Sequence, residues 1–323
     1  MKSRLAAILE IGSTGIRLLV AEIQSNGEWN ILDRAGMPVV LGREVFNSGE
    51  LSRESLLECL TVLRNLRELL DGWGITAGDV HVIATSTLRV ARNRDMFIDR
   101  IRQETGFNLT VVDGIEENRL MYLGVRFALK QDLPLFWRAN SMIVEIGGGS
   151  TEVMLLRRGQ MVAAHSIKIG TIIIDQRSRL QAGPELFQER YLSESIRSTT
   201  TLLNAEMDLA HVRTFVVAGS DARLASVQVG SKLNENCRVI DRKEFIAFVE
   251  KVRSYSIEEC VQKLGISYSE AEGFIPGIFV LKLFLEQTGA AQVVVPLISI
   301  REVYLIDLAV GVIPNCRKNF FRK

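Results

Sequence analysis

The chain has 323 residues, 47% of them hydrophobic, which is enough material for the cores of two domains of ordinary size. Its 39 basic side chains almost balance its 38 acidic ones, so no overall charge draws it to a nucleic-acid polymer or a membrane surface. No apolar run approaches the roughly 20 residues that a transmembrane helix needs. The four cysteines form no CxxC pair and are typical of reduced thiols. We therefore expect a cytoplasmic protein that builds any anion site locally.

The first half of the chain begins with two apolar strands joined by a turn of small residues. The strands cover Ala7–Ile11 and Ile16–Ile23, and the turn between them is Gly12-Ser13-Thr14-Gly15. Helices and strands then alternate. We expect a helix over Ser52–Leu70 with Ser52 as N-cap, a strand over Val80–Ala84, a helix over Met96–Thr105 closed by Gly106, a strand over Leu109–Val112 and a helix over Glu116–Leu129.

The second half, which follows Pro134, begins in the same way. A strand over Met142–Ile146 runs into Gly147-Gly148-Gly149-Ser150, and a second strand covers Val153–Leu156. Further elements are a strand over Gln160–Ile169, a helix over Glu185–Met207, a strand over Thr214–Val217, and mainly helix until a strand over Gln292–Val295. The repeated strand–turn–strand unit indicates an internal duplication, and the alternation predicts α/β layers in which helices cover mixed sheets.

Both small-residue turns are candidates for phosphate binding. Glycines and hydroxyl residues after a strand let backbone N–H groups approach an anion closely. Either turn alone is as compatible with a plain hairpin. The pair, preceded at the same offset by Glu10 and Glu145, favours phosphate binding. The chain lacks GxxxxGK[ST] and the spacing of a dinucleotide fingerprint, which excludes both of those nucleotide-binding classes.

Two further segments carry charged groups just past expected strands. The run from Ala84 to Arg94 holds hydroxyls and three arginines, whose guanidinium forks match phosphate oxygens; a solvated helix start is the alternative, above all for Arg94. Arg17, just after the first turn, is another candidate. The acids Glu116 and Glu117 open a helix, where carboxylates often only complement the helix dipole.

In chain order, these motifs resemble the exopolyphosphatase and guanosine pentaphosphate phosphohydrolase family of the actin/sugar-kinase/Hsp70 superfamily. The resemblance covers essentially the whole chain and rests on E-I-G-S-T-G-I-R, A-T-S-T-L-R-V-A-R-N-R, D-G-I-E-E-N-R-L-M-Y-L-G-V and E-I-G-G-G-S-T-E. Weaker matches follow at Ala271–Gly277 and Ser299–Val303. The chain is similar to short members that lack the C-terminal helical domain.

The resemblance implies an α/β fold with two actin-like (ribonuclease-H-like) domains, mixed sheets flanked by helices, and an active-site cleft between them. We expect domain I to cover residues 1–130, joined by a C-terminal helix over 300–312, and domain II to cover 131–299.

The resemblance also implies roles for particular residues. Glu117, rather than Glu116, would activate a water molecule for in-line attack on the terminal phosphorus. Mg²⁺, with Mn²⁺ as an alternative, would be held by Glu10, Glu145 and Glu152. The phosphate-binding residues would be Gly12, Ser13, Thr14, Arg17, Arg89, Arg92, Gly147, Gly148, Gly149, Ser150 and Thr151.

The sequence departs from the family pattern at several of these positions. Glu10 and Glu145 stand where the family has aspartate, and a third glycine motif reads Gly219-Ser220-Asp221 instead of Gly-Gly-Thr. Thr14 and Asn118 also differ from the family pattern. Because Mg²⁺ demands near-octahedral ligands, two longer carboxylates imply a re-spaced metal site, a changed phosphate geometry or lost turnover.

Two functions therefore stay open. The first is Mg²⁺-dependent hydrolysis of the terminal phosphoanhydride bond in inorganic polyphosphate or guanosine pentaphosphate. The alternative is a catalytically weakened sensor of the same fold that binds a phosphate chain or an alarmone. The expected partner is polyphosphate or a guanosine polyphosphate, with a homodimer left open. A kinase is a distant third because the altered glycine motif is poorly suited to holding a nucleoside.

Overall fold

The computed structural model describes residues 3–130, 132–179 and 184–310. The chain divides into two compact units, and each is described by itself. Among the described residues, unit 1 comprises those within Met1–Leu120 and Ser299–Lys323, and unit 2 comprises those within Met121–Ile298. The boundary after Leu120 falls inside a helix. The domain bounds expected from the sequence, 1–130 and 131–299, stay a prediction.

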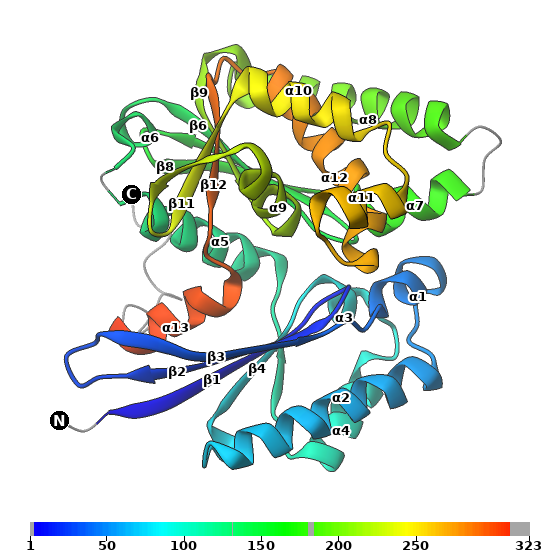
Figure 1. Cartoon of the computed structure of the whole chain (residues 1–323), viewed down its shortest axis with the longest axis vertical. Helices are drawn as coiled ribbons and strands as arrows, with labels where there is room; N and C mark the ends of the chain where they lie inside the picture. Colours follow the sequence, from blue (N-terminus) through cyan, green and yellow to red (C-terminus); the bar gives the residue numbers. More distant parts are fainter. Residues whose placement is uncertain (1–2, 131, 180–183, 311–323) are drawn as a thin grey trace. The chain divides into compact units, whose positions relative to one another are not determined.

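Unit 1 holds a five-stranded sheet and the helices beside it (Figure 1). Its elements are β1 (Arg4–Ile11), β2 (Ile16–Ile23), β3 (Trp29–Met37), α1 (Leu41–Ser48), α2 (Arg53–Gly72), η1 (Ala77–Asp79), β4 (Val80–Ala84), α3 (Ser86–Val90), α4 (Arg94–Thr105), β5 (Leu109–Val111), the start of α5 (Gly114–Leu129), and α13 (Ile300–Val310). Ser52 caps α2 by accepting a hydrogen bond from the Ser55 N–H, and Gly106 ends α4 in the left-handed conformation, as the sequence predicted.

Unit 2 holds a seven-stranded sheet with helices on its faces. Its elements are the end of α5, α6 (Pro134–Arg138), β6 (Asn140–Ile146), β7 (Thr151–Arg157), β8 (Gln160–Ile167), α7 (Thr171–Arg179), α8 (Pro184–Glu206), η2 (Leu209–His211), β9 (Val212–Ala218), α9 (Ser220–Val229), β10 (Ser231–Asn234), β11 (Cys237–Asp241), α10 (Arg242–Val252), α11 (Ile257–Leu264), α12 (Tyr268–Glu286) and β12 (Gln292–Pro296).

The two sheets share one topology, which confirms the predicted internal duplication. The strand order is β3-β2-β1-β4-β5 in unit 1, and β8-β7-β6-β9-β12 forms the matching part of unit 2. In each unit the first three strands pair antiparallel and the next two are added parallel. Unit 2 then adds β11 and β10, antiparallel, in a segment that the sequence had suggested to be mainly helical. Both sheets are therefore mixed, as predicted.

Alternating burial along β1 builds the core on both faces of the unit 1 sheet. Ala7, Leu9 and Ile11 pack into one cluster with α2 and α4, whereas Ala6 and Ile8 face a second cluster that contains Leu305 of α13. A strand that is buried on both faces reads as a continuous apolar run. The helix α13 thus covers the face of the sheet opposite α2 and joins a late segment of the chain to its first strands.

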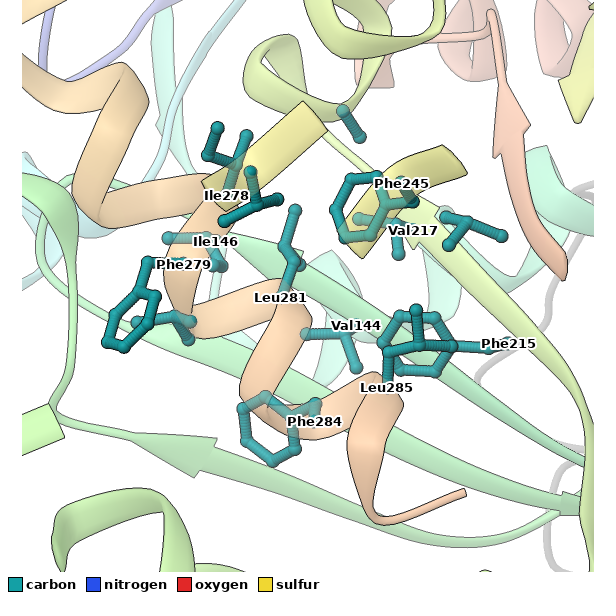
Figure 2. Close-up of a cluster of buried hydrophobic side chains, with 14 of the residues drawn as sticks. Val144, Ile146, Phe215, Val217, Phe245, Ile278, Phe279, Leu281, Phe284 and Leu285 are labelled. Atoms are coloured by element: carbon teal, nitrogen blue, oxygen red, sulfur yellow. The ribbon is translucent and has the colours of Figure 1, made fainter. Parts of the chain in front are cut away.

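The unit 2 sheet is also covered on both faces. Val144 and Ile146 of β6 pack with Phe215 and Val217 of β9 against α10 and α12, as Figure 2 shows. Ile143, one residue away on β6, belongs to a separate cluster on the opposite face. The α12 segment, which contains the most apolar stretch of the sequence, is therefore core. None of the helices in the described residues is long and apolar enough to cross a membrane.

Parallel strands place the candidate residues at one edge of each sheet. The carboxyl ends of β1, β4 and β5 lie side by side, because Ile11 is in register with Ala84 and Ala84 with Val111. In unit 2, Glu145 of β6 is in register with Ala218 of β9. Ligands of open α/β sheets bind outside this edge, so the loops that follow these strands define where to look for a site.

Candidate functional site

The two small-residue turns have the same backbone hydrogen bond. Gly12 N–H donates to Gly15 O at 2.9 Å, and Gly147 N–H donates to Ser150 O at 2.8 Å. Each turn closes a hairpin between the first two strands of its unit. A Cβ at position 12 would lie 3.4 Å from Gly15 O, which is an ordinary van der Waals contact. The duplicated sequence motif thus corresponds to a duplicated backbone shape.

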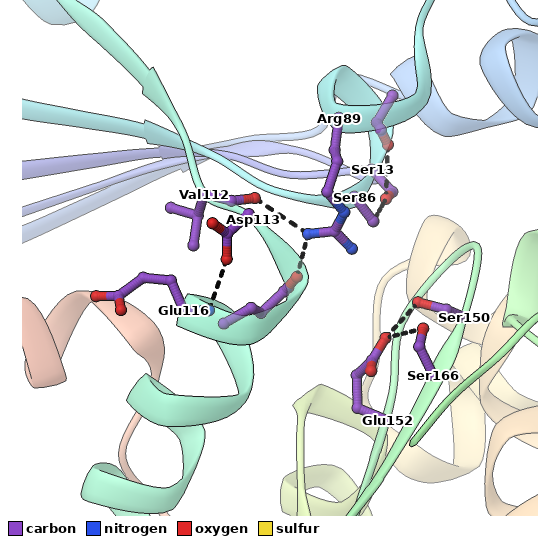
Figure 3. Close-up of polar contacts among 11 residues, drawn as sticks. Ser13, Ser86, Arg89, Val112, Asp113, Glu116, Ser150, Glu152 and Ser166 are labelled. Carbon is purple, nitrogen blue, oxygen red and sulfur yellow. Dashed lines mark hydrogen bonds and ion pairs between the residues drawn. The ribbon is translucent and has the colours of Figure 1, made fainter. Parts of the chain in front are cut away.

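In unit 1, hydroxyl groups gather where β1 and β4 end. Thr87 Oγ1 donates to Ser13 Oγ at 2.7 Å, and Ser13 Oγ lies 3.3 Å from Ser86 Oγ (Figure 3). The Gly42 N–H of α1 donates to Ser13 O at 2.9 Å and fixes the turn from its other side. Ser13, Ser86 and Thr87 come from segments that are more than 70 residues apart in the chain, so the fold assembles this cluster.

Arg89 and Glu117 form an ion pair at the same edge. Arg89 Nη1 lies 2.6 Å from Glu117 Oε2. It also donates to Val112 O at 3.1 Å, as Figure 3 shows. Each side chain keeps about a fifth of its surface exposed, 23% for Arg89 and 19% for Glu117. The Arg89 guanidinium thus places a positive charge beside the Glu117 carboxyl group.

Neighbouring acids at the start of α5 are occupied differently. Asp113 Oδ1 accepts from the Glu116 N–H at 2.8 Å, which satisfies the helix N-terminus. Glu116 pairs in a bidentate manner with Arg119, at 2.7 and 2.6 Å. Of the two candidate glutamates, Glu117 is the one that pairs with Arg89, one of the three arginines predicted to bind phosphate.

Glu10, expected to bind metal, lies among arginines of unit 1. Its Oε2 is 3.2 Å from Nε of Arg301, a residue of the first turn of α13. Arg17 is the cross-strand partner of Glu10, and its Nη2 donates to Thr14 Oγ1 at 3.3 Å. The two arginines place positive charge on both sides of this carboxylate.

Arg92 and Arg94 point elsewhere. Arg92 Nη2 donates to Ser48 O at 2.9 Å, and its Nε lies 3.3 Å from Glu50, so it ties down the end of α1. Arg94 Nη1 donates to Arg89 O at 3.1 Å. The structure therefore groups Ser13, Arg89 and Glu117, and it places Arg92 in contacts of another kind. Its proposed role in phosphate binding stays a prediction.

In unit 2, helix α7 supports the glycine turn. Thr171 N–H donates to Gly147 O and Ile172 N–H donates to Gly148 O, both at 3.0 Å. The loop carbonyls are thereby directed to the helix. Gly170 makes this approach feasible, since a Cβ there would lie 2.3 Å from Gly148 O. The Thr151 hydroxyl donates to Ile169 O and closes the turn from the β7 side.

Glu152 is a buried carboxylate beside this turn. It is 5% exposed, and its Oε1 accepts from Ser150 at 2.9 Å and from Ser166 at 2.7 Å (Figure 3). Its Oε2 is buried without a hydrogen-bond partner among the described residues. Glu145 is its direct cross-strand partner, so the two carboxylates lie on one face of the hairpin. Two like charges placed in this way favour a cation nearby.

The third glycine motif adds another carboxyl group to this edge. Gly219, at φ 104°, precedes α9, and a Cβ there would lie 3.8 Å from Cγ of Glu145. Asp221 packs against Gly277 of α12, where a Cβ would lie within 2.2 Å of Asp221 Oδ2. Burial, with a contribution from the charge of Glu270, raises the pKa of Asp221 to about 7.

The comparison with protein families is direct. A family model described as the Ppx/GppA phosphatase family matches residues 19–310, which is most of the chain. The chain belongs to the Ppx/GppA phosphatase family. This result confirms the family that the sequence motifs indicated.

Two curated relatives and one solved structure illustrate the similarity. Exopolyphosphatase 2 of Mycobacterium tuberculosis is 30% identical over 237 residues, 70% of each chain. The guanosine-5'-triphosphate,3'-diphosphate pyrophosphatase of Pseudoalteromonas atlantica is 28% identical over 204 residues. That match covers 63% of this chain but only 38% of the longer relative. The structure of an exopolyphosphatase from Cytophaga hutchinsonii has a TM-score of 0.81 at 19% identity, covering 96% of this chain and 99% of that one. It confirms the fold.

Several Ppx/GppA residues at this site were not assigned a role from the sequence. Arg301 lies in a segment that was noted only as a weak motif match, although its side chain reaches Glu10. Ser166 and Gly170 belong to no motif, yet they contact Glu152 and the glycine turn. Contacts of this kind depend on tertiary structure, because the two partners are 14 to 291 residues apart.

Proposed function

We propose that this Ppx/GppA protein hydrolyses the terminal phosphoanhydride bond of a phosphate chain, either inorganic polyphosphate or guanosine pentaphosphate. The observation that carries the proposal is the Arg89–Glu117 pair beside the hydroxyl cluster of Ser13 and Thr87. A carboxylate, a guanidinium and glycine-turn N–H groups at one sheet edge supply a base and anion-binding donors. The names of the relatives, an exopolyphosphatase and a guanosine pyrophosphatase, support the same class of substrate.

In this mechanism, Glu117 accepts a proton from a water molecule whose oxygen attacks the terminal phosphorus. The bond from phosphorus to the bridging oxygen breaks, and the shortened chain leaves with the negative charge. Arg89 orients Glu117 through Nη1, and we assign the rest of its fork to a phosphate oxygen. The N–H groups of Ser13 and Thr14 in unit 1, and those of Gly148 to Ser150 in unit 2, bind phosphate oxygens in their own units.

A divalent cation, Mg²⁺ or Mn²⁺, fits the carboxylates of unit 2. Glu145 and Glu152 oppose each other, and Glu152 has a buried oxygen without a hydrogen-bond partner among the described residues. The two residues would hold the ion, and bound phosphate oxygens would complete its shell. When bound, the ion withdraws charge from the phosphoryl oxygens. The described residues contain no group of three or more His, Cys, Asp or Glu side chains that could hold a metal by themselves.

The role of Glu117 is tested by measuring phosphate release from long-chain polyphosphate and from guanosine pentaphosphate with Mg²⁺ and with Mn²⁺. A positioned general base contributes roughly 10²–10⁴-fold to a rate. We therefore expect Glu117→Gln to lower kcat by about that factor while substrate binding survives, because the change removes negative charge near a polyanion.

Glu116→Gln is the matched control. It makes the same change in the adjacent residue, which pairs with Arg119 instead of Arg89. We expect its kcat to stay within about threefold of the wild type. A wild type that binds polyphosphate tightly but releases no phosphate under either metal would overturn the hydrolase and leave a phosphate-chain or alarmone sensor. Equal losses in both variants would remove Glu117 as the base.

A further inference from the structure

The interactions around Glu10 differ from those expected of a metal ligand. Its carboxylate lies 3.2 Å from Arg301 Nε, and both side chains are well shielded, at 16% and 12% exposure. Opposite it on β2 stands Arg17, whose Nη1 would lie 3.3 Å from a Cβ on Gly12. The same point is 3.7 Å from Glu10 Oε1, so carboxylate and guanidinium face one glycine. A divalent ion at Glu10 would meet two nearby cations, which repel it.

The position of Arg301 is fixed by the start of α13. Glu302 Oε2 accepts from the Ser299 N–H at 2.9 Å, and Glu302 also pairs with Arg34 of β3. Burial alone would raise the pKa of Glu302, but hydrogen bonds from Ser299 and Arg34 and the charge of Arg34 lower it below its ordinary value. Glu302 is therefore charged and connects the start of α13 to strand β3 of the sheet. Leu305, one turn further along α13, packs in the core with Ile8.

The length of the side chain at position 10 matters to this contact. Glutamate carries its carboxylate one methylene farther from the backbone than aspartate, roughly 1.5 Å at standard single-bond lengths. In this chain the extra length ends at Arg301. The region of the first turn then holds the guanidinium groups of Arg17 and Arg301 and the carboxylate of Glu10, beside the backbone N–H groups of Ser13 and Thr14.

We propose that Arg301 is a phosphate-binding residue of the first turn and that Glu10 is its positioning residue, not a metal ligand. This inference rests on the proposed function and assigns different chemistry to the turn of unit 1 and the turn of unit 2. A guanidinium fork has five donors, so Arg301 can contact Glu10 and a phosphate oxygen at the same time. Arg301 supplies the charge that a metal ion supplies elsewhere, and it does so without the need for dehydration of an ion.

The test measures binding of inorganic tripolyphosphate by calorimetry in EDTA, where neither metal nor turnover contributes. We expect Arg301→Gln to weaken binding at least about tenfold, as is usual for loss of a charge-assisted hydrogen bond. Arg64→Gln is the matched control. Arg64 lies on α2, away from the turn, and it also pairs with a glutamate of unit 1, Glu104, at 2.7 Å. Its affinity should equal that of the wild type.

A second substitution distinguishes a loss of phosphate binding from a loss of folding. Arg301→Lys keeps the charge but loses the fork, so it should fold and bind tripolyphosphate about threefold to tenfold more weakly. Melting curves of each variant identify any that do not fold. Wild-type affinity in both Arg301 variants would overturn the inference and leave the hydrolase standing. A wild type that binds no tripolyphosphate would instead overturn the proposed function, and this inference with it.

The role of Glu10 has its own measurement, the binding of Mn²⁺ followed by electron paramagnetic resonance. We expect Glu10→Gln to change Mn²⁺ affinity less than about twofold, whereas Glu152→Gln should lower it at least about tenfold, as removal of one charged ligand implies. If Glu10→Gln lowers Mn²⁺ affinity as much as Glu152→Gln does, Glu10 is a metal ligand, and its assignment as the positioning residue of Arg301 is wrong.

Discussion

The two hairpins of this protein have the same backbone and opposite electrostatics. In unit 1, Glu10 faces Arg17 across the hairpin and touches Arg301, whereas in unit 2 the corresponding Glu145 faces Glu152. The helices that follow are more alike: α3 after β4 and α9 after β9 each begin with a serine and carry an arginine three residues later, Arg89 and Arg223, but α9 also has Asp221 in its first turn. A duplicated fold has thus produced one edge suited to anions and one suited to a cation.

The helices that donate hydrogen bonds to the two turns also differ in how closely they approach them. In unit 1, the N–H of Gly42 in α1 reaches Ser13 O, and in unit 2 the N–H of Ile172 in α7 reaches Gly148 O. Only the second approach needs a glycine just before the helix, at Gly170. We therefore expect the unit 2 turn to be held more rigidly, because the N–H groups of both Thr171 and Ile172 donate to its carbonyl oxygens.

One prediction tests this difference in support. Gly170→Ala puts a methyl group 2.3 Å from Gly148 O and 2.4 Å from Gly149 N, both backbone atoms that cannot move alone. We expect it to lower the free energy of unfolding by about 1–3 kcal/mol, as overpacking typically does, and to displace the glycine turn. Urea unfolding at constant pH measures the loss.

Gly12→Ala in the other turn is the paired control. Its Cβ would meet the end of the flexible Arg17 side chain at 3.3 Å, which can shift. Its cost should stay below about 1 kcal/mol. If both variants lose the same stability, the two turns are equally constrained and the contrast in rigidity is wrong.

The elements that the sequence predicted are those with local signals, and the ones it missed depend on distant residues. Apolar runs and caps predicted β1, β2, α2, β4 and α4 because these elements carry local signals, such as Ser52 and Gly106. The edge strand β3 was missed because its residues are mostly exposed or half-buried and alternate weakly. β11 was missed because its pairing with β12, more than fifty residues later, is what makes it a strand.

The site was predicted in its parts but not in its pairings. The glycine turns and Glu117 followed from motifs that lie within a few residues of one another. The partner of Glu10 is 291 residues away, and nothing in the local sequence of Arg301 indicates which carboxylate it meets. The sequence also could not distinguish a Glu that faces an Arg from a Glu that faces a Glu, since that depends on hairpin register.

A second prediction concerns Asp221, on the acidic edge. Its folded pKa of about 7 lies above the ordinary value of 3.8, because burial disfavours the charged form. Folded Asp221 therefore keeps its proton while the unfolded group loses it, so stability falls as pH rises from about 4 to 7 and then levels off. Asp221→Asn should remove this loss. The gain is at most about 4 kcal/mol at 1.36 kcal/mol per pH unit, and less where water reaches the half-buried side chain.

Urea unfolding of the wild type and of Asp221→Asn at pH 4 and at pH 8 measures this gain. The two proteins should agree near pH 4 and diverge by pH 8, with the variant more stable. Asp208→Asn is a suitable control, because hydrogen bonds from His211 and Ala210 lower the pKa of that exposed carboxyl group. A wild type whose stability is flat between pH 4 and pH 8 relative to Asp221→Asn would show that Asp221 is charged in the folded protein.

The smallest expected effect concerns the opposed glutamates of the unit 2 hairpin, which distinguish it from the unit 1 hairpin. Glu145 and Glu152 are opposed like charges, and such cross-strand pairs cost roughly 0.2–1 kcal/mol when no cation lies between them. In EDTA, Glu152→Gln should therefore raise the melting temperature slightly, because the amide oxygen can still accept from Ser150 and Ser166. Added Mg²⁺ should stabilise the wild type more than this variant, since binding to the folded state adds stability by mass action.

Glu10→Gln should show neither the gain in EDTA nor the reduced response to Mg²⁺, because Glu10 already has cations beside it. An equal Mg²⁺ response in wild type and Glu152→Gln would mean that the acidic hairpin holds no ion, and the two edges would then differ in charge but not in ligand.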